Sequence, residues 1–374
     1  MNELINYKLA LFHDGGPVSG TSTYFYNIYR NLKVHDVQCD LYQYLAWKPQ
    51  IEVDKNIKIL PSSRVNKIPK SDLLRKMHTA IDLTYGFNWK AFLENIEADI
   101  FILSNPSLLK LTRYYKNVIA IAHDLYYMHE NTDSSILNRY FKRQYQLFKT
   151  ARNIITNSKF TKSELVQLLD LNEGDISVVY PYVNKDIFYP LARGHQKANH
   201  KLNEKLILSV GSDQPNKNIE NVILTLKNLP DNYKLIRVGN ITYTRKLIDD
   251  LNLSKRISTY NNLSAEELAN IYRNADILLF PSLHEGFGIP VVEAMASGTP
   301  VVTSDRGSLP EVVGNAGIIV DPLEPKKIAD RILELTTDDK MNEELICKGL
   351  MRAEDFTREK QFSQILAVLQ GNLQ

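Results

Sequence analysis

Two glutamates, Glu285 and Glu293, lie eight residues apart in the richest stretch of the sequence. An ionised carboxylate accepts several hydrogen bonds, so this pair suits a ligand with many hydroxyl groups, such as a sugar. Gly286 and Gly288 would let the backbone approach a ligand closely. Pro290 suits the first turn of a helix, whose free N–H groups and dipole favour an anion. The stretch therefore predicts a loop that binds phosphate and sugar hydroxyls. The alternative is that Glu285 only caps the helix and Glu293 lies on its surface.

This loop follows an apolar run of strand length, and similar runs recur along the whole chain. Amphipathic, helix-like stretches separate the runs, which is typical of parallel sheets covered by helices. The runs lack polar–apolar alternation, as expected of strands that are covered on both faces. The expected strands are Lys8–Phe12, Ile100–Leu103, Val118–Ala122, Arg152–Thr156, Leu206–Val210, Lys234–Val238, Asp276–Phe280 and Pro300–Thr303.

A polar segment over residues 188–205, with Pro190 and Gly194, interrupts this alternation and has the composition of a linker. We therefore predict an α/β protein with two Rossmann-like, doubly wound domains, 1–190 and 206–355, joined by a linker over 191–205. Such sheets bind ligands at the carboxyl ends of their strands, so two facing domains would enclose a cleft.

Three hydroxyl residues stand three positions before a glutamate, which is the spacing of a capping box. The pairs are Thr161 with Glu164, Ser264 with Glu267, and Ser308 with Glu311. Each pair predicts the start of a helix.

Length and composition exclude several classes of protein. The chain has 374 residues, with 44% hydrophobic and 24% charged residues, which is typical of a globular protein of two domains. No apolar run approaches the roughly 18 residues of a membrane-spanning helix. The N-terminus, with Glu3 and Lys8, does not resemble a signal peptide. Cys39 and Cys347 form no pattern for a disulfide framework or a zinc site, so we expect a cytoplasmic protein.

Charge is distributed unevenly between the two halves. The net charge is only +2, which argues against a nucleic-acid partner. Residues 1–200 carry 25 basic and 19 acidic residues, whereas residues 201–374 carry 20 and 24. Within 101–150, seven basic residues face three acidic ones. This excess is either a solvated helix face or a surface for an anionic membrane or a phosphate-bearing substrate.

The glutamate pair resembles the Glu-x7-Glu motif of the retaining family-4 glycosyltransferases, which have the GT-B fold. Further segments resemble that family in the same order along nearly the whole chain. They are His123-Asp124-Leu125, residues 154–160, residues 178–184, Leu208–Gly211 followed by Lys217-Asn218, and Leu309–Val313.

The resemblance implies a role for each matching residue. Glu293 would bind the nucleotide ribose and Glu285 would lie against the donor sugar. Lys217 would neutralise the diphosphate, and His123 would lie at the far edge of the sugar, unless it is a satisfied core histidine. The implied catalytic residues are His123, Lys217 and Glu285. The implied donor-binding residues are Gly16, Gly20, Gly211, Ser212, Lys217, Gly286, Phe287, Gly288, Ile289 and Glu293. The loop that holds Gly16 and Gly20 could equally be a plain strand-to-helix turn.

One departure from the family pattern concerns the diphosphate site. Many members carry an arginine directly after the glycine that is Gly211 here, whereas this chain has Ser212. Lys217 is then the one basic residue that the motifs assign to the diphosphate. Arg237 and Arg306 remain open as substitutes.

The resemblance implies a retaining transfer of a hexose from a nucleotide sugar to a glycan or lipid-linked acceptor. We expect no cofactor and no metal, because no Asp-x-Asp segment is placed to hold one, so Lys217 and the amides of 286–288 would stabilise the leaving diphosphate. Attack on the face that the leaving group departs from is expected, with a covalent intermediate on Glu285 as the alternative. A nucleotide-sugar epimerase and a catalytically weak partner subunit also remain open.

By the same resemblance, the N-terminal domain binds the acceptor and the helical stretch 356–374 packs back onto that domain. The basic residues of 110–116 and of the expected helix 136–151 would lie near an anionic membrane surface, giving peripheral association. The alternative for 136–151 is a core-facing aromatic stripe with a solvated basic back. Family frequency alone favours GDP-mannose or UDP-glucose as the donor.

Overall fold

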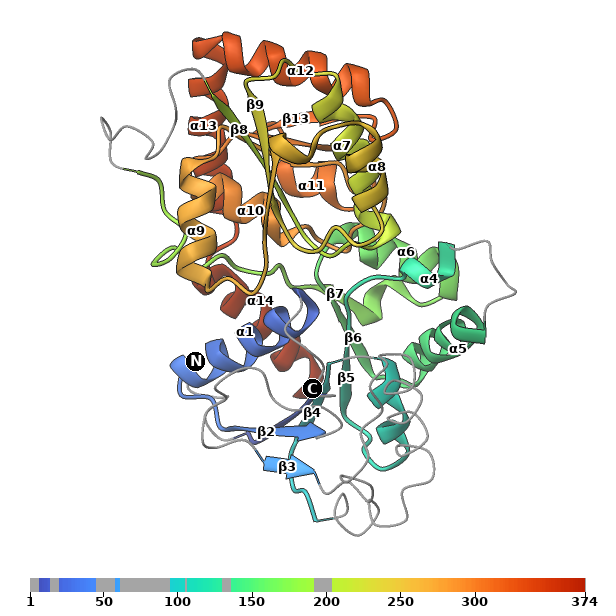
Figure 1. Cartoon of the computed structure of the whole chain (residues 1–374). Coiled ribbons are helices and arrows are strands. Elements are labelled where there is room, and N and C mark those ends of the chain that lie inside the picture. The colour runs from blue at the N-terminus through green and yellow to red at the C-terminus, as the bar shows by residue number, and fades with distance from the viewer. Residues whose placement is uncertain are drawn as a thin grey trace. The chain divides into compact units, whose positions relative to one another are not determined.

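The computed structural model describes residues 7–13, 20–44, 58–60, 95–104, 106–129, 136–191 and 204–373. The chain divides into two compact units. Unit 1 comprises residues 1–181 and 359–374, and unit 2 comprises residues 182–358. Each unit has its own sheet and its own buried core (Figure 1).

Unit 1 contains a parallel sheet that has seven strands among its described residues, in the order β3-β2-β1-β4-β5-β6-β7. Its central strands β1, β4 and β5 are apolar except for His13 at the end of β1, and every residue of these three strands is buried. The elements are β1 Leu9–His13, α1 Gly20–Val34, β2 Cys39–Tyr44, β3 Lys58–Leu60, β4 Ile100–Leu103, η2 Pro106–Arg113, β5 Val118–Ala122, α4 Tyr126–His129, α5 Ile136–Tyr145, η3 Gln146–Thr150, β6 Asn153–Thr156, α6 Lys159–Leu169, η4 Glu173–Asp175, β7 Ile176–Val178 and α14 Arg358–Leu373.

Unit 2 contains a parallel sheet with the strand order β10-β9-β8-β11-β12-β13. One of its apolar cores joins strands β8, β9, β11, β12 and β13 to α7, α12 and α13. The elements are β8 Lys205–Val210, η5 Pro215–Lys217, α7 Ile219–Lys227, β9 Tyr233–Val238, α8 Arg245–Asp250, η6 Ser254–Arg256, β10 Ile257–Tyr260, α9 Ala265–Asn274, β11 Ile277–Phe280, α10 Ile289–Ala296, β12 Val301–Ser304, α11 Leu309–Val313, β13 Ile318–Val320, α12 Pro325–Thr337 and α13 Asp339–Ala353. The predicted doubly wound α/β class is therefore confirmed.

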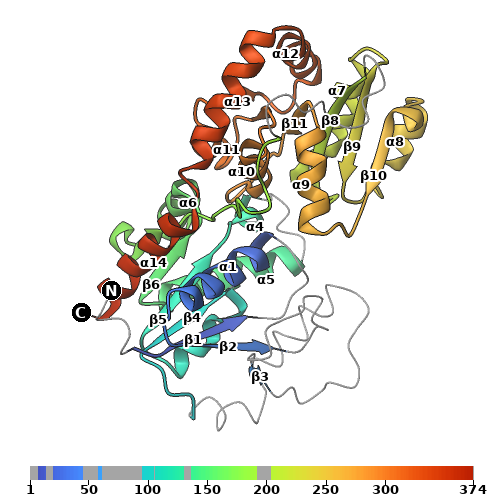
Figure 2. The same cartoon turned by 90° about the vertical axis from the view of Figure 1, so that its left-hand side faces the viewer.

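The last helix, α14, packs in unit 1 although it follows all of unit 2 in sequence (Figure 2). Its apolar side chains, which include Ile365 and Leu369, join the core that α1 forms with the sheet. Asn31 of α1 donates a hydrogen bond to Gln361 at 3.2 Å, and Gln361 donates one to the Tyr180 carbonyl at 3.1 Å. The C-terminal stretch is thus part of the unit 1 core.

Unit 2 begins at Tyr182, before the boundary expected at residue 190. Hydrogen bonds hold the segment 182–190 to unit 2, since Val183 donates to the Phe356 carbonyl at 3.0 Å and Arg273 donates to the Ile187 carbonyl at 3.0 Å. Most of the expected linker, residues 192–203, lies outside the described residues.

Two of the predicted helix starts differ from the structure. The N-cap of α6 is Ser158, not Thr161, because Ser158 has the extended backbone of a cap and its hydroxyl accepts the Thr161 N–H. Ser308 precedes α11 without capping it. The third prediction is confirmed, because Ser264 and Glu267 form a reciprocal capping box at α9.

The expected helix 136–151 also differs from the structure. The α-helix α5 ends at Tyr145, and the chain continues as the 3-10 helix η3. Tyr145 and Phe148 are buried in the unit 1 core, and Phe141 packs against that core. In the described part of the chain, no helix has the length and apolar character needed to cross a membrane.

Candidate active site

The loop between β11 and α10 carries the predicted sugar-binding residues of unit 2. Gly288 is the N-cap of α10, with φ at 95°, a region that side chains with a Cβ rarely adopt. A Cβ at this position would lie 2.6 Å from Leu309 Cδ2. Gly288 therefore lets the chain turn from the loop into the helix that carries Glu293.

Lys217 and Glu285 meet at the carboxyl edge of this sheet, although they are 68 residues apart in sequence. The Lys217 Nζ donates to Glu285 Oε1 at 2.5 Å, and both side chains are mostly buried. The ammonium group also lies 5.8 Å from the centroid of the Phe280 ring. The structure thus pairs the predicted diphosphate cation with the predicted sugar carboxylate.

Hydrogen bonds connect the segment around Lys217 to the segment around Glu285. The Leu283 N–H donates to the Asn216 carbonyl at 2.7 Å, and the Asn216 side chain donates to the His284 carbonyl at 3.3 Å. Asn218 is buried with φ at 57°, and its side-chain amide donates to the Pro281 and Pro322 carbonyls at 3.0 and 2.9 Å. These two asparagines therefore fix the loops on which the ion pair depends.

A second contact fixes the backbone of Glu285 itself. Gly307 has φ at 62°, and a Cβ there would lie 2.8 Å from the Glu285 carbonyl oxygen. Ser308 donates to the same carbonyl from its N–H at 3.2 Å and from its hydroxyl at 3.0 Å. The Ser308 hydroxyl is thus directed to the Glu285 loop, which explains why it does not cap α11.

The turn after β8 holds Gly211, with φ at 141°, and the side chain of Lys217 packs over it. Gly239, which directly follows β9, faces this turn, and a Cβ on Gly239 would lie 1.9 Å from the Gly211 carbonyl oxygen. Gly239 was not among the predicted site residues. Its signal in the sequence is only a glycine directly after an expected strand.

Arg237 supports this turn from within the sheet. Its side chain is completely buried and donates to the carbonyls of Gly211 at 2.7 Å, Ser212 at 3.0 Å and Val238 at 2.9 Å. Burial lowers the pKa of Arg237 to about 10, whereas the nearby Asp213 raises it. Arg237 is therefore a support for the Gly211–Ser212 backbone and does not present its charge to a ligand.

Arg306, the other open substitute, lies in the turn after β12. It is half exposed and its guanidinium lies 3.3 Å from Asp305 and 3.5 Å from Asp321. Of these three basic residues, Lys217 is the one whose side chain contacts the Glu285 loop.

Glu293 lies on α10 and accepts a hydrogen bond from the Tyr272 hydroxyl at 2.9 Å. Burial raises the pKa of Glu293 to about 7, whereas the hydrogen bond from Tyr272 lowers it. Near neutral pH, this carboxyl group is therefore close to its midpoint of ionisation. Tyr272 was not among the predicted site residues, since a tyrosine within an amphipathic helix gives no distinct signal.

In unit 1, the predicted site residue His123 lies at the carboxyl end of β5. His123 directly follows β5, and its Nε2 donates to the Ser104 carbonyl at 2.9 Å. The Tyr24 ring meets the histidine edge to face at 5.6 Å. Gly20 is the first residue of α1, and Gly16 lies outside the described residues.

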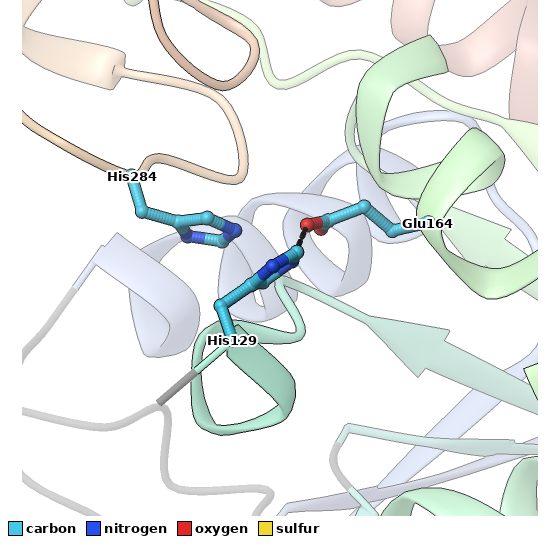
Figure 3. Close-up of side chains that lie close together, drawn as sticks. All are labelled: His129, Glu164 and His284. Atoms are coloured by element: carbon cyan, nitrogen blue, oxygen red, sulfur yellow. Dashed lines mark hydrogen bonds and ion pairs between the residues drawn. The ribbon is translucent and has the colours of Figure 1, made fainter. Parts of the chain in front are cut away.

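A further pair at this edge joins His129 at the end of α4 to Glu164 on α6 (Figure 3). The His129 side chain is half exposed, whereas Glu164 is buried. Glu164 thus lies within α6 and pairs with His129, and it does not form the predicted capping box with Thr161. His284, also drawn in Figure 3, belongs to unit 2.

Comparison with sequence families shows two matches that follow one another along the chain. The model of Glycosyltransferase Family 4 matches residues 18–187, and that of Glycosyl transferases group 1 matches residues 192–350. The chain therefore belongs to the group of glycosyltransferases that these two models describe. His123 lies in the family 4 half, and the Lys217, Glu285 and Glu293 constellation lies in the group 1 half.

Relatives of this glycosyltransferase differ in how much of the chain they match. An O-antigen chain mannosyltransferase of Salmonella typhimurium is 34% identical over 219 residues, which cover 56% of this chain. The chain spans 58% of the length of that relative. A sucrose-phosphate synthase from Thermosynechococcus elongatus has a TM-score of 0.82 at 20% identity, covering 98% of this chain and 99% of the other. The Anabaena protein HepE, solved with UDP and glucose, has a TM-score of 0.71 at 16% identity, with 98% and 100% coverage. These two structures show that the fold is GT-B.

Proposed function

We propose that this chain is a retaining glycosyltransferase that moves a hexose from a nucleotide sugar to a glycan or lipid-linked acceptor. The observation that carries the proposal is the meeting of Lys217 and Glu285 at one sheet edge, with Glu293 on the helix that follows. The mannosyltransferase name of a relative and the UDP and glucose of HepE support a nucleotide-hexose donor.

In the proposed mechanism, Lys217 neutralises the diphosphate as the bond to the sugar breaks. In the free protein its ammonium group is paired with Glu285, so a diphosphate would compete for the same cation. A fixed cation stabilises the leaving group most as its charge grows, which lowers the barrier to transfer. The released Glu285 carboxylate would then accept hydrogen bonds from the sugar hydroxyls.

Glu293 would accept hydrogen bonds from the ribose, and the amides of residues 286–288 would reach the sugar and phosphate. The acceptor hydroxyl would attack on the face that the diphosphate leaves, and a phosphate oxygen would take its proton. No metal is required in this scheme, because Lys217 and the amides carry the stabilisation.

The test measures nucleotide binding and sugar transfer by the purified protein. Replacing Glu293 by alanine should weaken UDP or GDP binding by about ten- to a hundredfold, because a hydrogen bond to a charged group is worth about 1.5–3 kcal/mol. An affinity within twofold of that of the wild type would contradict the ribose assignment.

Labelled UDP- and GDP-hexoses with glycan and lipid acceptors should give a product of retained anomeric configuration. EDTA should leave the rate within about twofold, since Lys217 is expected to act in place of a metal.

We also propose that unit 1 associates with anionic membranes through a basic surface, defined here by residues 106–116 and 136–152. These segments hold eight lysines and arginines and no acidic residue. Thr112 of η2 donates to Thr150 of η3 at 3.1 Å, and Arg152 donates to Asn117 at 3.4 Å, so the two segments adjoin. Because Tyr145 and Phe148 lie in the core, the attraction would be electrostatic and would weaken with salt.

A further inference from the structure

Tyr272 is the side chain that contacts the carboxylate of Glu293, and it comes from a different helix, α9. The tyrosine has no exposed surface. Its hydroxyl donates to Glu293 Oε2, which leaves Oε1 as the oxygen that would accept a hydrogen bond from a ribose hydroxyl. The two residues are 21 positions apart, so the spacing of the glutamate motif does not include this contact.

The position of the tyrosine is itself fixed from two sides. The Thr299 hydroxyl donates to the Tyr272 carbonyl at 2.6 Å, which joins α9 to the turn between α10 and β12. The Phe188 ring meets the Tyr272 ring edge to face, with centroids 5.9 Å apart. A side chain held in this way can define the direction of the carboxylate that it bonds.

Three basic side chains on the neighbouring helices α9 and α13 have partners other than Glu293. Arg273 of α9 donates to the Ile187 carbonyl and lies over the Tyr189 ring. Arg352 of α13 donates to the carbonyls of Glu311 and Val312, and Lys348 of the same helix pairs with Glu344. The ionisation of Glu293 is therefore governed by its burial and by Tyr272.

We propose that Tyr272 is a positioning residue for the nucleotide, orienting the Glu293 carboxylate toward the ribose and favouring its charged form. This inference rests on the proposed function, in which Glu293 binds the ribose. A hydrogen bond donated to a carboxylate stabilises the ionised form, so losing it raises the pKa. The pKa of Glu293, about 7 with the bond present, would then rise further without it.

The test is Tyr272→Phe, which keeps the ring and removes only the hydroxyl. UDP and GDP affinities are measured for both proteins at pH 7 and at pH 9, and the ratio of variant to wild type cancels the titration of the ligand. If the pKa of Glu293 rises by about one unit, the variant binds roughly fivefold more weakly at pH 7 and nearly as well as wild type at pH 9. Tyr233→Phe is the matched control, because Tyr233 is also buried in unit 2 and its hydroxyl bonds Thr336 instead. It should bind like the wild type at both pH values.

Each outcome decides between the proposals. No loss at either pH overturns both parts of the Tyr272 proposal. An equal loss at pH 7 and pH 9 overturns the effect of Tyr272 on the ionisation of Glu293, because a shifted ionisation cannot weaken binding equally at both pH values. We expect the nucleotide affinity of the wild type to rise between pH 6 and pH 8 as Glu293 ionises. Glu293→Gln cannot ionise, so it should lose this rise, whether or not Tyr272→Phe folds. If Glu293→Gln binds nucleotide with the affinity and pH dependence of wild type, the ribose assignment fails. If it loses the rise while Tyr272→Phe keeps the wild-type profile, the Tyr272 inference alone fails.

Discussion

Unit 2 and unit 1 hold their candidate functional residues by different means. In unit 2, Lys217 and Glu285 lie on segments that two asparagines and closely packed glycines hold in place. In unit 1, the basic surface consists of side chains at the periphery of the core, several of them exposed. A site of the first kind tolerates few changes, whereas a surface of the second kind depends on the sum of its charges. Four predictions test this difference, starting with the largest expected effect.

Gly239→Ala should cause the greatest damage. The new Cβ would lie 1.9 Å from the Gly211 carbonyl oxygen at a residue whose φ is 128°. Strain and a clash with backbone should cost about 3–5 kcal/mol of unfolding free energy and abolish nucleotide binding. Gly371→Ala is the control, because nothing lies within 4 Å of its added Cβ within α14, and it should stabilise by about 0.5–1 kcal/mol. Urea unfolding measures both, and a Gly239→Ala loss below about 1 kcal/mol would refute the tight approach.

The sequence predicts those parts of the structure that depend on local patterns of residues, and Gly239 is an example of a part that it does not predict. The central strands and the loop from Glu285 to Gly288 were predictable, because continuous apolar runs and short spacings are local signals. Strands at the sheet edges were not, as in β10, where residues 258–260 are exposed and polar or aromatic. Gly239 acts through Gly211, 28 positions away, so no local pattern identifies it. Arg237 could have faced a ligand or the sheet, and only the packing distinguishes the two.

Lys217→Ala should lower kcat by about 100- to 1,000-fold, the range seen when one preorganised charge stabiliser is removed. Nucleoside diphosphate affinity should fall less, because the phosphate charge grows as the bond to the sugar breaks. Lys227→Ala, at the exposed end of α7, is the control and should change neither value. Steady-state kinetics and calorimetry separate the two effects. A loss of affinity with kcat unchanged would mean that Lys217 binds the diphosphate equally in the ground state and in the transition state.

The basic surface should respond to the number of charges removed. Its exposed basic side chains include Arg113 on η2, Lys116 just before β5, and Lys149 on η3. Changing all three to glutamine should reduce binding to anionic liposomes by about a hundredfold or more at low salt, because each contributes about 1 kcal/mol. The control is the triple glutamine variant of Lys227, Lys246 and Lys255, which are exposed in unit 2. Sedimentation with anionic and neutral vesicles measures the binding. If the wild type pellets equally with both, the membrane proposal is wrong and a soluble acceptor is the better hypothesis.

Arg306→Ala should have the smallest effect, and it tests whether Lys217 acts alone. Arg306 is half exposed and forms ion pairs with Asp305 and Asp321. Exposed ion pairs of this kind contribute about 0–1 kcal/mol to stability. The loss of Arg306 should change UDP and GDP affinity by less than about threefold and leave the ratio of turnover to affinity unaltered. A tenfold loss that grows at low salt would mean that Arg306 leaves its carboxylate partners for the diphosphate. It would then supply the charge that Ser212 lacks, and the tightly fixed loops of unit 2 would include one side chain that moves when the donor binds.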